Sequence, residues 1–264
     1  MTPAAILAHV DRGTTWPPHA GWPADLAAAY RDALAVRALR CARGERPAGF
    51  KIGFTNRTIW ARYGVFAPIW GSVWNTTLQH CADGRATLSL ARLCQPRLEP
   101  ELVFGLRATP GEAPTLAQLF DCIDWLATGF EIVQSHCPDW KFSAAETVAD
   151  GSLHARLFVG PTQPLREFAP DAARLDERLG AAGVRLQRGD SLVEQGCGAN
   201  VLDGPLHALQ HFVHELQRCP GAPALQPGDV VTTGTWTDAW PLAPGQTWRA
   251  EFDAPLPAIS LATR

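Results

Sequence analysis

The sequence predicts an α+β protein, in which a helical N-terminal part precedes a mixed β core. Two observations carry this prediction. Apolar residues recur at near-helical spacing before residue 48 and again over 205–219. From about residue 85 onward, short runs typical of strands alternate with Gly- and Pro-rich turns. We expect 1–75 to be the mainly helical part and 76–264 the mixed β catalytic core, together forming one continuous structural unit.

The elements of the N-terminal part follow from local signals. Pro23-Ala24-Asp25 is a helix start, because Asp can cap the first free backbone N–H groups. Apolar residues follow at near-helical spacing: Leu26, Tyr30, Leu34 and Leu39. After a break rich in Gly and Pro, we expect a strand over 50–54, a short helix over 58–63 and an extended segment over 68–74.

The core is predicted to be rich in strands, with two helices. The expected strands cover 97–106, 129–135, 153–159, 184–187, 229–233 and 247–252. The expected helices cover 115–122 and 205–219. The second helix has the stronger pattern, because its apolar residues form one stripe: Leu206, Leu209, Val213 and Leu216.

Composition limits the partners and the compartment. A formal net charge of -3 without any Lys/Arg run argues against a nucleic-acid partner. No apolar run approaches the roughly 18 residues that a membrane span needs, and Met1–Val10 lacks the basic start of a signal peptide. The seven cysteines are scattered and include no Cys-x-x-Cys pair. We therefore expect reduced thiols in a cytoplasmic protein that does not bind membranes.

Acidic residues in apolar strands are the most informative chemical feature. Glu99 and Glu101 alternate with apolar residues, so both side chains point to one face of the expected strand. Glu131 is a lone acid in the apolar run 129–133. Buried carboxylates repel each other unless they share a proton or a cation, and a hard cation prefers such oxygen ligands. The alternative is that these acids are solvated on an ordinary amphipathic strand. Pro100 lacks a backbone donor, which predicts an edge strand or a strand start.

An ordered set of motifs resembles the fumarylacetoacetate hydrolase superfamily, in its branch of 2-keto-4-pentenoate hydratases and 2-oxo-3-hexenedioate decarboxylases. The motifs are Phe50-Lys51-Ile52-Gly53-Phe54-Thr55, Glu99-Pro100-Glu101-Leu102, Phe130-Glu131-Ile132-Val133, Glu146-Thr147-Val148-Ala149-Asp150, Gly198-Ala199-Asn200-Val201-Leu202, Gly228-Asp229-Val230-Val231 and Thr233-Gly234-Thr235. Together they cover roughly residue 45 to the end. The resemblance implies a β core of the roll or sandwich type.

The resemblance also implies a chemistry and its residues. It implies that Glu99, Glu101 and Glu131 bind Mg²⁺ or Mn²⁺, and that a small 2-oxo acid chelates this cation. Polarisation of the ketone then stabilises an enolate. The expected enzyme is a lyase of the hydratase or decarboxylase type in aromatic catabolism, assembled as a homo-oligomer. Lys51 and Thr235 are expected to contact the substrate, Lys51 also as a catalytic cation; otherwise Lys51 extends from a strand end to solvent and Thr235 is a turn residue.

Two departures from the family pattern concern proton transfer. The hydratases usually carry an Asp in the turn matching Val73-Trp74-Asn75-Thr76, where this chain has no titratable side chain. They also favour Val-Asp-Ser-Arg where this chain has Val133-Gln134-Ser135-His136. His136 and His154 are therefore candidates for proton transfer. Two alternatives stay open: a hydrolase that cleaves a C–C bond in an acylpyruvate, with one of these histidines as the base, and a non-catalytic relative that binds an oxo acid.

Overall fold

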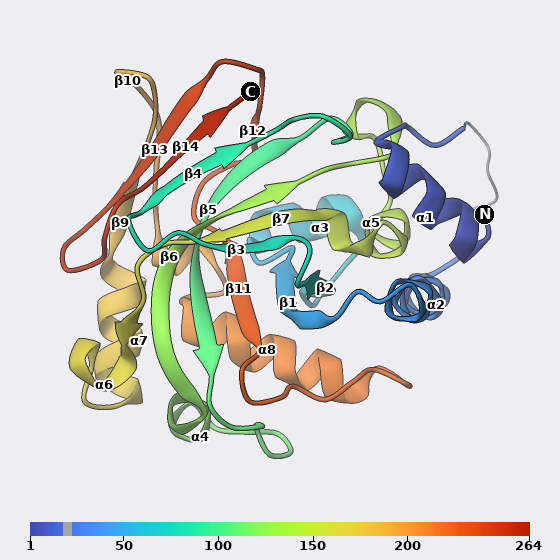
Figure 1. The fold of residues 1–264 in the computed structure, drawn as a ribbon. Helices are drawn as coiled ribbons and strands as arrows, with labels where there is room; N and C mark the ends of the chain where they lie inside the picture. The colour runs from blue at the N-terminus through green and yellow to red at the C-terminus, as the bar shows by residue number, and fades with distance from the viewer. Residues whose placement is uncertain (18–22) are drawn as a thin grey trace.

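The computed structural model describes residues 1–17 and 23–264 (Figure 1). The helices are α1 (Pro3–Arg12), α2 (Leu26–Ala42), α3 (Trp60–Tyr63), α4 (Leu116–Cys122), α5 (Ala144–Ala149), α6 (Leu165–Phe168), α7 (Ala172–Ala181) and α8 (Pro205–Arg218), with short 3-10 helices η1 (Arg57–Ile59), η2 (Pro138–Trp140), η3 (Gly151–Leu153) and η4 (Gly198–Asn200). The strands are β1 (Pro47–Gly53), β2 (Ile69–Trp74), β3 (Leu78–His80), β4 (Arg85–Leu88), β5 (Arg97–Leu106), β6 (Ile123–Val133), β7 (His154–Val159), β8 (Gln163–Pro164), β9 (Gly183–Arg188), β10 (Ser191–Cys197), β11 (Val230–Thr235), β12 (Trp240–Pro241), β13 (Thr247–Phe252) and β14 (Ile259–Thr263).

Two mixed sheets form the body of the protein. In the larger sheet the main path runs β2-β1-β11-β5-β6-β7-β3, with β12 paired to β5 and β8 paired to β6. The smaller sheet has the order β10-β9-β13-β14-β4. The larger sheet curls strongly, with α4 and α8 below it, α6 and α7 on one flank and α1 and α2 on the other in the view of Figure 1. The mixed strands and helices confirm the predicted α+β class with a mixed β core.

The first 75 residues combine helices with two strands of the larger sheet. Asp25 caps α2 by accepting from the N–H of Ala28, so the helix begins at the predicted signal. α1 and α2 pack on α5 through a small apolar cluster that includes Ile6, Ala29 and Val148. β1 pairs with β2 on one side and with β11, from the C-terminal part, on the other. The segment 1–75 therefore contributes directly to the sheet that carries the acidic residues.

Helix α8 buries the predicted apolar stripe in the main core. Leu206, Leu209 and Val213 are almost completely excluded from solvent. Phe212 extends this face and packs against Phe50 of β1, with ring centroids 5.4 Å apart. α8 thereby supports the strand that carries Lys51.

The position of strand β5 corrects one expectation. β5 is a central strand between β11 and β6, not an edge, and Pro100 is its fourth residue. The carbonyl of Pro100 accepts from the N–H of Trp236, so the proline nitrogen faces the same neighbour. There the pairing of β11 with β5 is irregular between Thr232 and Thr235. The missing donor is tolerated because it falls at this irregularity.

Among the described residues, none of the helices has both the length and the apolar composition that crossing a bilayer requires.

Candidate active site

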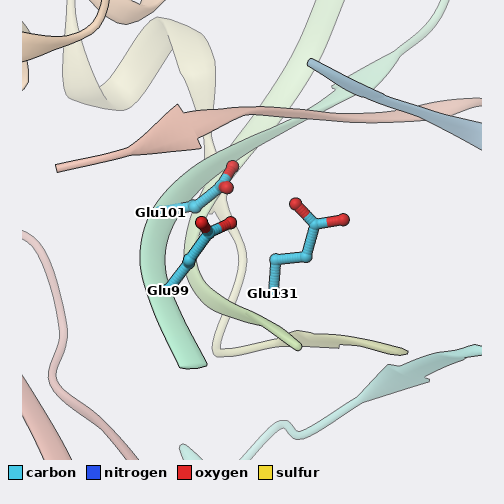
Figure 2. A group of neighbouring side chains, drawn as sticks. All are labelled: Glu99, Glu101 and Glu131. Atoms are coloured by element: carbon cyan, nitrogen blue, oxygen red, sulfur yellow. The ribbon is translucent and has the colours of Figure 1, made fainter. Parts of the chain in front are cut away.

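Three glutamates from two paired strands converge on one point (Figure 2). Glu99 and Glu101 share a face of β5, and Glu131 of β6 lies directly opposite Glu99 in the antiparallel register. Each glutamate contributes a carboxylate oxygen, and these three oxygens lie within 4.8 Å of one another. Glu101 and Glu131 are fully buried, and Glu99 is partly exposed. Among the described residues, this is the only group of three potential ligand side chains at such separations.

Backbone irregularity in β11 shapes the surroundings of Glu101. The hydroxyl of Thr232 and the N–H of Gly234 both donate to Oε2 of Glu101, the latter over 2.7 Å. Gly234 has a φ of 103°, and a Cβ there would lie 2.1 Å from Oγ1 of Thr55, so no other residue fits. Oε1 of Glu101 is buried and has no hydrogen-bond partner among the residues that the structure describes. One oxygen is thus fixed by the protein, and the other is left for a ligand.

Glu131 has two buried partners. Nζ of Lys51 lies 3.2 Å from its Oε2, and Nδ1 of His154 lies 2.8 Å from its Oε1. Nε2 of His154 lies 2.8 Å from the hydroxyl of Thr77, which accepts from the N–H of Trp74. Because a carboxylate only accepts, His154 donates through Nδ1 and accepts the Thr77 hydroxyl at Nε2. With His154 neutral, this chain of hydrogen bonds fixes the orientation of the Glu131 carboxylate.

The electrostatics of the three carboxyls differ because their partners differ. Burial, together with the charge of Glu131, raises the pKa of Glu99 to about 7 despite the opposing effect of Lys51. Burial and the charges of both neighbours raise the pKa of Glu101 well above its ordinary value. Burial also opposes ionisation of Glu131, but Lys51 and His154 outweigh it and lower the pKa. With only one buried lysine beside them, the three carboxyls do not all ionise readily, and Glu99 and Glu101 retain protons that a further positive charge would displace.

The pKa values of Lys51 and His154 are shifted in opposite directions. Burial disfavours the charged form of Lys51, but Glu131, Glu99 and Glu101 more than offset this and raise its pKa. For His154 burial prevails over the stabilising contact with Glu131 and lowers the pKa. Lys51 is consequently a cation at neutral pH, and His154 is a neutral donor.

A cavity of about 260 Å³ opens onto this cluster. Lys51 and Glu99 line it, together with Thr235. Much of the remaining wall is apolar and aromatic: Phe54, Ile59, Tyr63, Ile69, Val133, Trp140, Phe142, Leu153 and Trp236. The cavity can hold a small acid whose polar end meets the carboxylates and Lys51 while its carbon chain lies along the apolar wall.

The other predicted site residues lie in different surroundings. Thr235 lines the cavity, but its hydroxyl donates to the carbonyl of Thr237 over 2.9 Å. His136 is buried against Asp150, with 2.5 Å between Nδ1 and Oδ1, and stacks on Trp16. Neither His136 nor His154 is among the described residues that line the cavity.

The turn at residues 75 and 76 does not reach the cavity. Asn75 accepts from the N–H of Arg46 over 2.7 Å, and the Thr76 hydroxyl donates to Glu45. Both residues are absent from the described cavity lining. In this chain the two side chains tie the turn to the segment before β1.

Sequence reasoning missed the residues that hold the glutamates. Thr77 and Thr232 are buried hydroxyls in contact with His154 and Glu101, respectively. Thr232 precedes the Thr233-Gly234-Thr235 motif, so the clustering of hydroxyls around a glycine was its only signal. Thr77 had none, because its partner lies 77 residues away.

The donor set fits a hard divalent cation. All three groups are carboxylates, which such cations prefer. An orphaned buried oxygen on Glu101 and the raised pKa values of two carboxyls are the features expected where a positive charge belongs. Of the three glutamates, Glu99 is partly exposed and lines the cavity, so a cation held here would lie beside the cavity.

Comparison with known proteins gives sequence relatives and a matching fold. No family model matches the chain. 2-Keto-4-pentenoate hydratase 1 of Dechloromonas aromatica is 34% identical over 194 residues, which cover 73% of this chain and 69% of that protein. 4-Oxalocrotonate decarboxylase of a Pseudomonas species is 29% identical over 243 residues, covering 90% and 89%. The solved structure of 4-oxalocrotonate decarboxylase from Pseudomonas putida G7, complexed with magnesium and adipate, superposes with a TM-score of 0.86 at 24% identity, covering 99% and 95%.

Proposed function

Because the chain belongs to the family of 2-keto-4-pentenoate hydratases and 4-oxalocrotonate decarboxylases, we propose that it is a metal-dependent lyase acting on a small 2-oxo or 2-hydroxydienoic acid. The observation that carries the proposal is the convergence of three carboxylates beside a cavity that Glu99 lines. Relatives named for both reactions support a hydratase or a decarboxylase. The structural relative complexed with magnesium supports a divalent cation, for which Mg²⁺ and Mn²⁺ are the candidates.

In this proposal Glu99, Glu101 and Glu131 hold the cation. When bound, it would polarise the 2-oxo group of the substrate and stabilise negative charge that develops there. Thr232 and Gly234 orient Glu101, and His154 orients Glu131, so two of the three ligands are oriented before the cation binds.

Lys51 supplies the second positive charge of the proposed site. Its ammonium lies beside Glu131 and lines the cavity, so it can contact a substrate carboxylate or a developing oxyanion. The apolar side chains of the cavity wall lower the local polarity, which strengthens these interactions. Thr235 keeps a proposed role in binding the substrate carboxylate, for which its hydroxyl would exchange the bond to Thr237.

A panel assay tests the proposed function. The protein is incubated with Mg²⁺ and a set of 2-hydroxydienoates, 2-oxo-3-enedioates and acylpyruvates, and the products are identified by NMR and mass spectrometry. We expect hydration or decarboxylation that stops when EDTA removes the metal and returns when Mg²⁺ is restored. Turnover that persists in EDTA, or none with any acid, would contradict the proposal.

Hydrolysis of an acylpyruvate is less well supported as the activity. It needs a base that activates water, and the two candidates, His136 and His154, are absent from the described cavity lining. His154 is also engaged at both ring nitrogens. The same panel covers this alternative, because cleavage of an acylpyruvate gives two carboxylic acids. It covers the non-catalytic alternative too, in which acids bind without turnover.

Metal binding is expected to strengthen as the pH rises through about 7. Glu99 and Glu101 have raised pKa values, so the metal-free site holds protons that the cation must displace. Calorimetric titration with Mn²⁺ between pH 6 and 8, in buffers of different ionisation enthalpy, should show proton release and a rising affinity. An affinity independent of pH in this range would show that the carboxyls are already ionised.

The raised pKa of Glu99 also predicts how the stability of the metal-free protein depends on pH. A carboxyl whose pKa is raised on folding binds more protons in the folded than in the unfolded state. Between the ordinary value of 4.5 and about 7, the Glu99 contribution to stability therefore falls as the pH rises. Chemical denaturation at several pH values should show this loss, and saturating Mn²⁺ should offset it.

His154 is expected to act by positioning Glu131. His154→Ala leaves Oε1 of Glu131 and the Thr77 hydroxyl without their partner, and metal affinity should fall by about 10- to 100-fold. His154→Asn places an amide donor close to the position of Nδ1 and should recover part of the affinity. Equal losses of metal affinity in both variants, measured by calorimetry, would point instead to a role in general packing.

Assembly and location remain predictions. We expect at least a dimer at micromolar concentration, which sedimentation equilibrium would check, and a cytoplasmic location.

A further inference from the structure

The cavity wall carries two acids besides Glu99. Among the described lining residues, the side chains that can carry a charge are Lys51, Arg62, Tyr63, Glu99, Glu194 and Asp238. The proposed function already assigns Lys51 to the substrate and Glu99 to the cation. Arginine and tyrosine side chains ordinarily keep their protons at neutral pH. Glu194 and Asp238 are therefore the remaining groups of this lining that can accept a proton from water.

Glu194 of β10 is half-buried and is held by two N–H donors. The indole of Trp240 donates to its Oε2 over 2.6 Å. The backbone N–H of Asp238 is shared between Oε2 at 3.0 Å and Oε1 at 3.2 Å. Oε1 thus accepts only the longer branch of a shared bond, which leaves it a lone pair for a water molecule. Neither donor carries a charge, so these bonds orient Glu194 and leave its negative charge in place.

Asp238 is the less suitable of the two acids. Its side chain is exposed, whereas that of Glu194 is half-buried. A group that transfers a proton must be held in the correct position relative to the reacting atoms, and an exposed side chain is free to take many positions. The backbone of Asp238 instead helps to hold Glu194, as its N–H is one of the two donors.

Glu194 lies beside the three glutamates but outside their group. Its donor Trp240 pairs with Leu98, the residue that precedes Glu99 in β5. Among the described residues the group of converging carboxylates contains three members, and Glu194 is not one of them. Glu99 and Glu194 nevertheless line the same cavity. A substrate whose 2-oxo acid end lies at Glu99 can therefore extend its next carbons along the wall that carries Glu194.

Addition of water to such a substrate requires a base at this wall. In a 2-oxo-3-enoic acid the carbonyl group is conjugated with the double bond between carbons 3 and 4, which makes carbon 4 electrophilic. The water oxygen forms a bond to carbon 4 while Glu194 takes one of its protons. The electron pair of the double bond moves toward the 2-oxo oxygen, where Lys51 can stabilise the negative charge. The proton then passes from Glu194 to carbon 3, which restores the carboxylate and gives a 4-hydroxy-2-oxo acid.

We propose that Glu194 is the base that activates the water added at carbon 4, so that the chain is a hydratase. This inference rests on the proposed function, a lyase for 2-oxo acids, and selects one reaction within it, because decarboxylation consumes no water. The two N–H donors keep the Glu194 carboxylate in position. The cavity places it in reach of the carbons that follow the 2-oxo group.

Glu194→Gln separates proton transfer from positioning. The amide oxygen can still accept from Trp240 and from the N–H of Asp238, but the side chain no longer takes a proton. In saturating Mg²⁺, kcat/KM for hydration of 2-oxopent-3-enoate should fall by about 100- to 1,000-fold. 2-Oxopentanoate has the same 2-oxo acid end and no double bond, so it binds without reacting. Its Mg²⁺-dependent affinity, measured by calorimetry, should be unchanged.

Asp190→Asn is the matched control, because it removes the same charge from the exposed turn between β9 and β10, outside the described cavity lining. It should leave hydration and binding as in the native protein. Asp238→Asn tests the rival acid: if this variant loses hydration while Glu194→Gln keeps it, the assignment of Glu194 is wrong. A Glu194→Gln protein that loses affinity for 2-oxopentanoate as strongly as it loses activity would also overturn it, since Glu194 would then only support the site.

The reaction of the native protein distinguishes this inference from the proposed function. Decarboxylation of a 2-oxo-3-enedioate without hydration of 2-oxopent-3-enoate would overturn the role of Glu194 and leave the lyase in place. An acylpyruvate such as 2,4-dioxopentanoate carries a carbonyl at carbon 4, which a water activated by Glu194 can also attack, so it is assayed in parallel. If the native protein hydrolyses this acid without hydrating the first, or turns over none of the three in Mg²⁺, the proposed lyase fails, and this inference fails with it.

Discussion

Glu101→Gln is expected to lower kcat/KM by on the order of 1,000-fold while the fold persists. The substitution removes one of three anionic ligands, and the loss of metal-assisted stabilisation of charge is worth several kcal/mol. The amide oxygen can still accept from Thr232 and Gly234, and the amide nitrogen takes the place of the unpartnered Oε1. Because the raised pKa already favours a neutral side chain, stability without metal should hold or rise. Activity and denaturant unfolding measure the two effects.

Glu112→Gln is the matched control, since it removes the same charge from an exposed position. It should change neither activity nor metal affinity. A fully active Glu101→Gln protein would remove Glu101 from the ligand set. A grossly unfolded one would mean that the ionised carboxylate itself supports the fold.

Lys51→Met is expected to separate catalysis from metal binding. The variant keeps the apolar stem and removes a charge that neighbours the substrate, so kcat/KM should fall by on the order of 100-fold. In the native protein Nζ of Lys51 lies 3.2 Å from Oε2 of Glu131 and competes with the cation for this carboxylate. Because the variant removes that competitor, its metal affinity should be unchanged or improved. Without metal, Glu131 loses its buried counter-ion, which should cost about 3–5 kcal/mol of stability. Calorimetry with Mn²⁺, kinetics and denaturation together give the three values.

Lys141→Met provides the control, because Lys141 is the only other lysine and is exposed. It should be active and as stable as the native protein. A Lys51→Met protein with normal turnover would exclude Lys51 from the site. One that no longer binds Mn²⁺ would show that Lys51 supports the metal ligands instead of the substrate.

Local sequence signals predicted the elements that carry the acids. Strand β5 was predicted with its observed bounds, because Glu99 and Glu101 alternate with apolar residues. The start of α2 followed from Asp25, and the buried face of α8 from its apolar stripe. These features depend on neighbours in the sequence, which is why they could be read directly.

Features that depend on pairing between distant segments could not be predicted in this way. The central position of β5 contradicts the expectation from Pro100, because the irregularity that accommodates the proline lies in β11, more than a hundred residues later. The two histidines look equivalent in sequence. Only the fold sets His154 against Glu131 and His136 against Asp150.

Anomalous diffraction from crystals grown with Mn²⁺ tests the central claim most directly. One carboxylate oxygen from each of Glu99, Glu101 and Glu131 lies within 4.8 Å of the other two, so small side-chain movements would let them share one ion with ligand distances of about 2.1 Å. We predict a single strong peak among these three side chains, with the free oxygen of Glu101 among the ligands. An occupied manganese site elsewhere and none between the three glutamates would contradict the account.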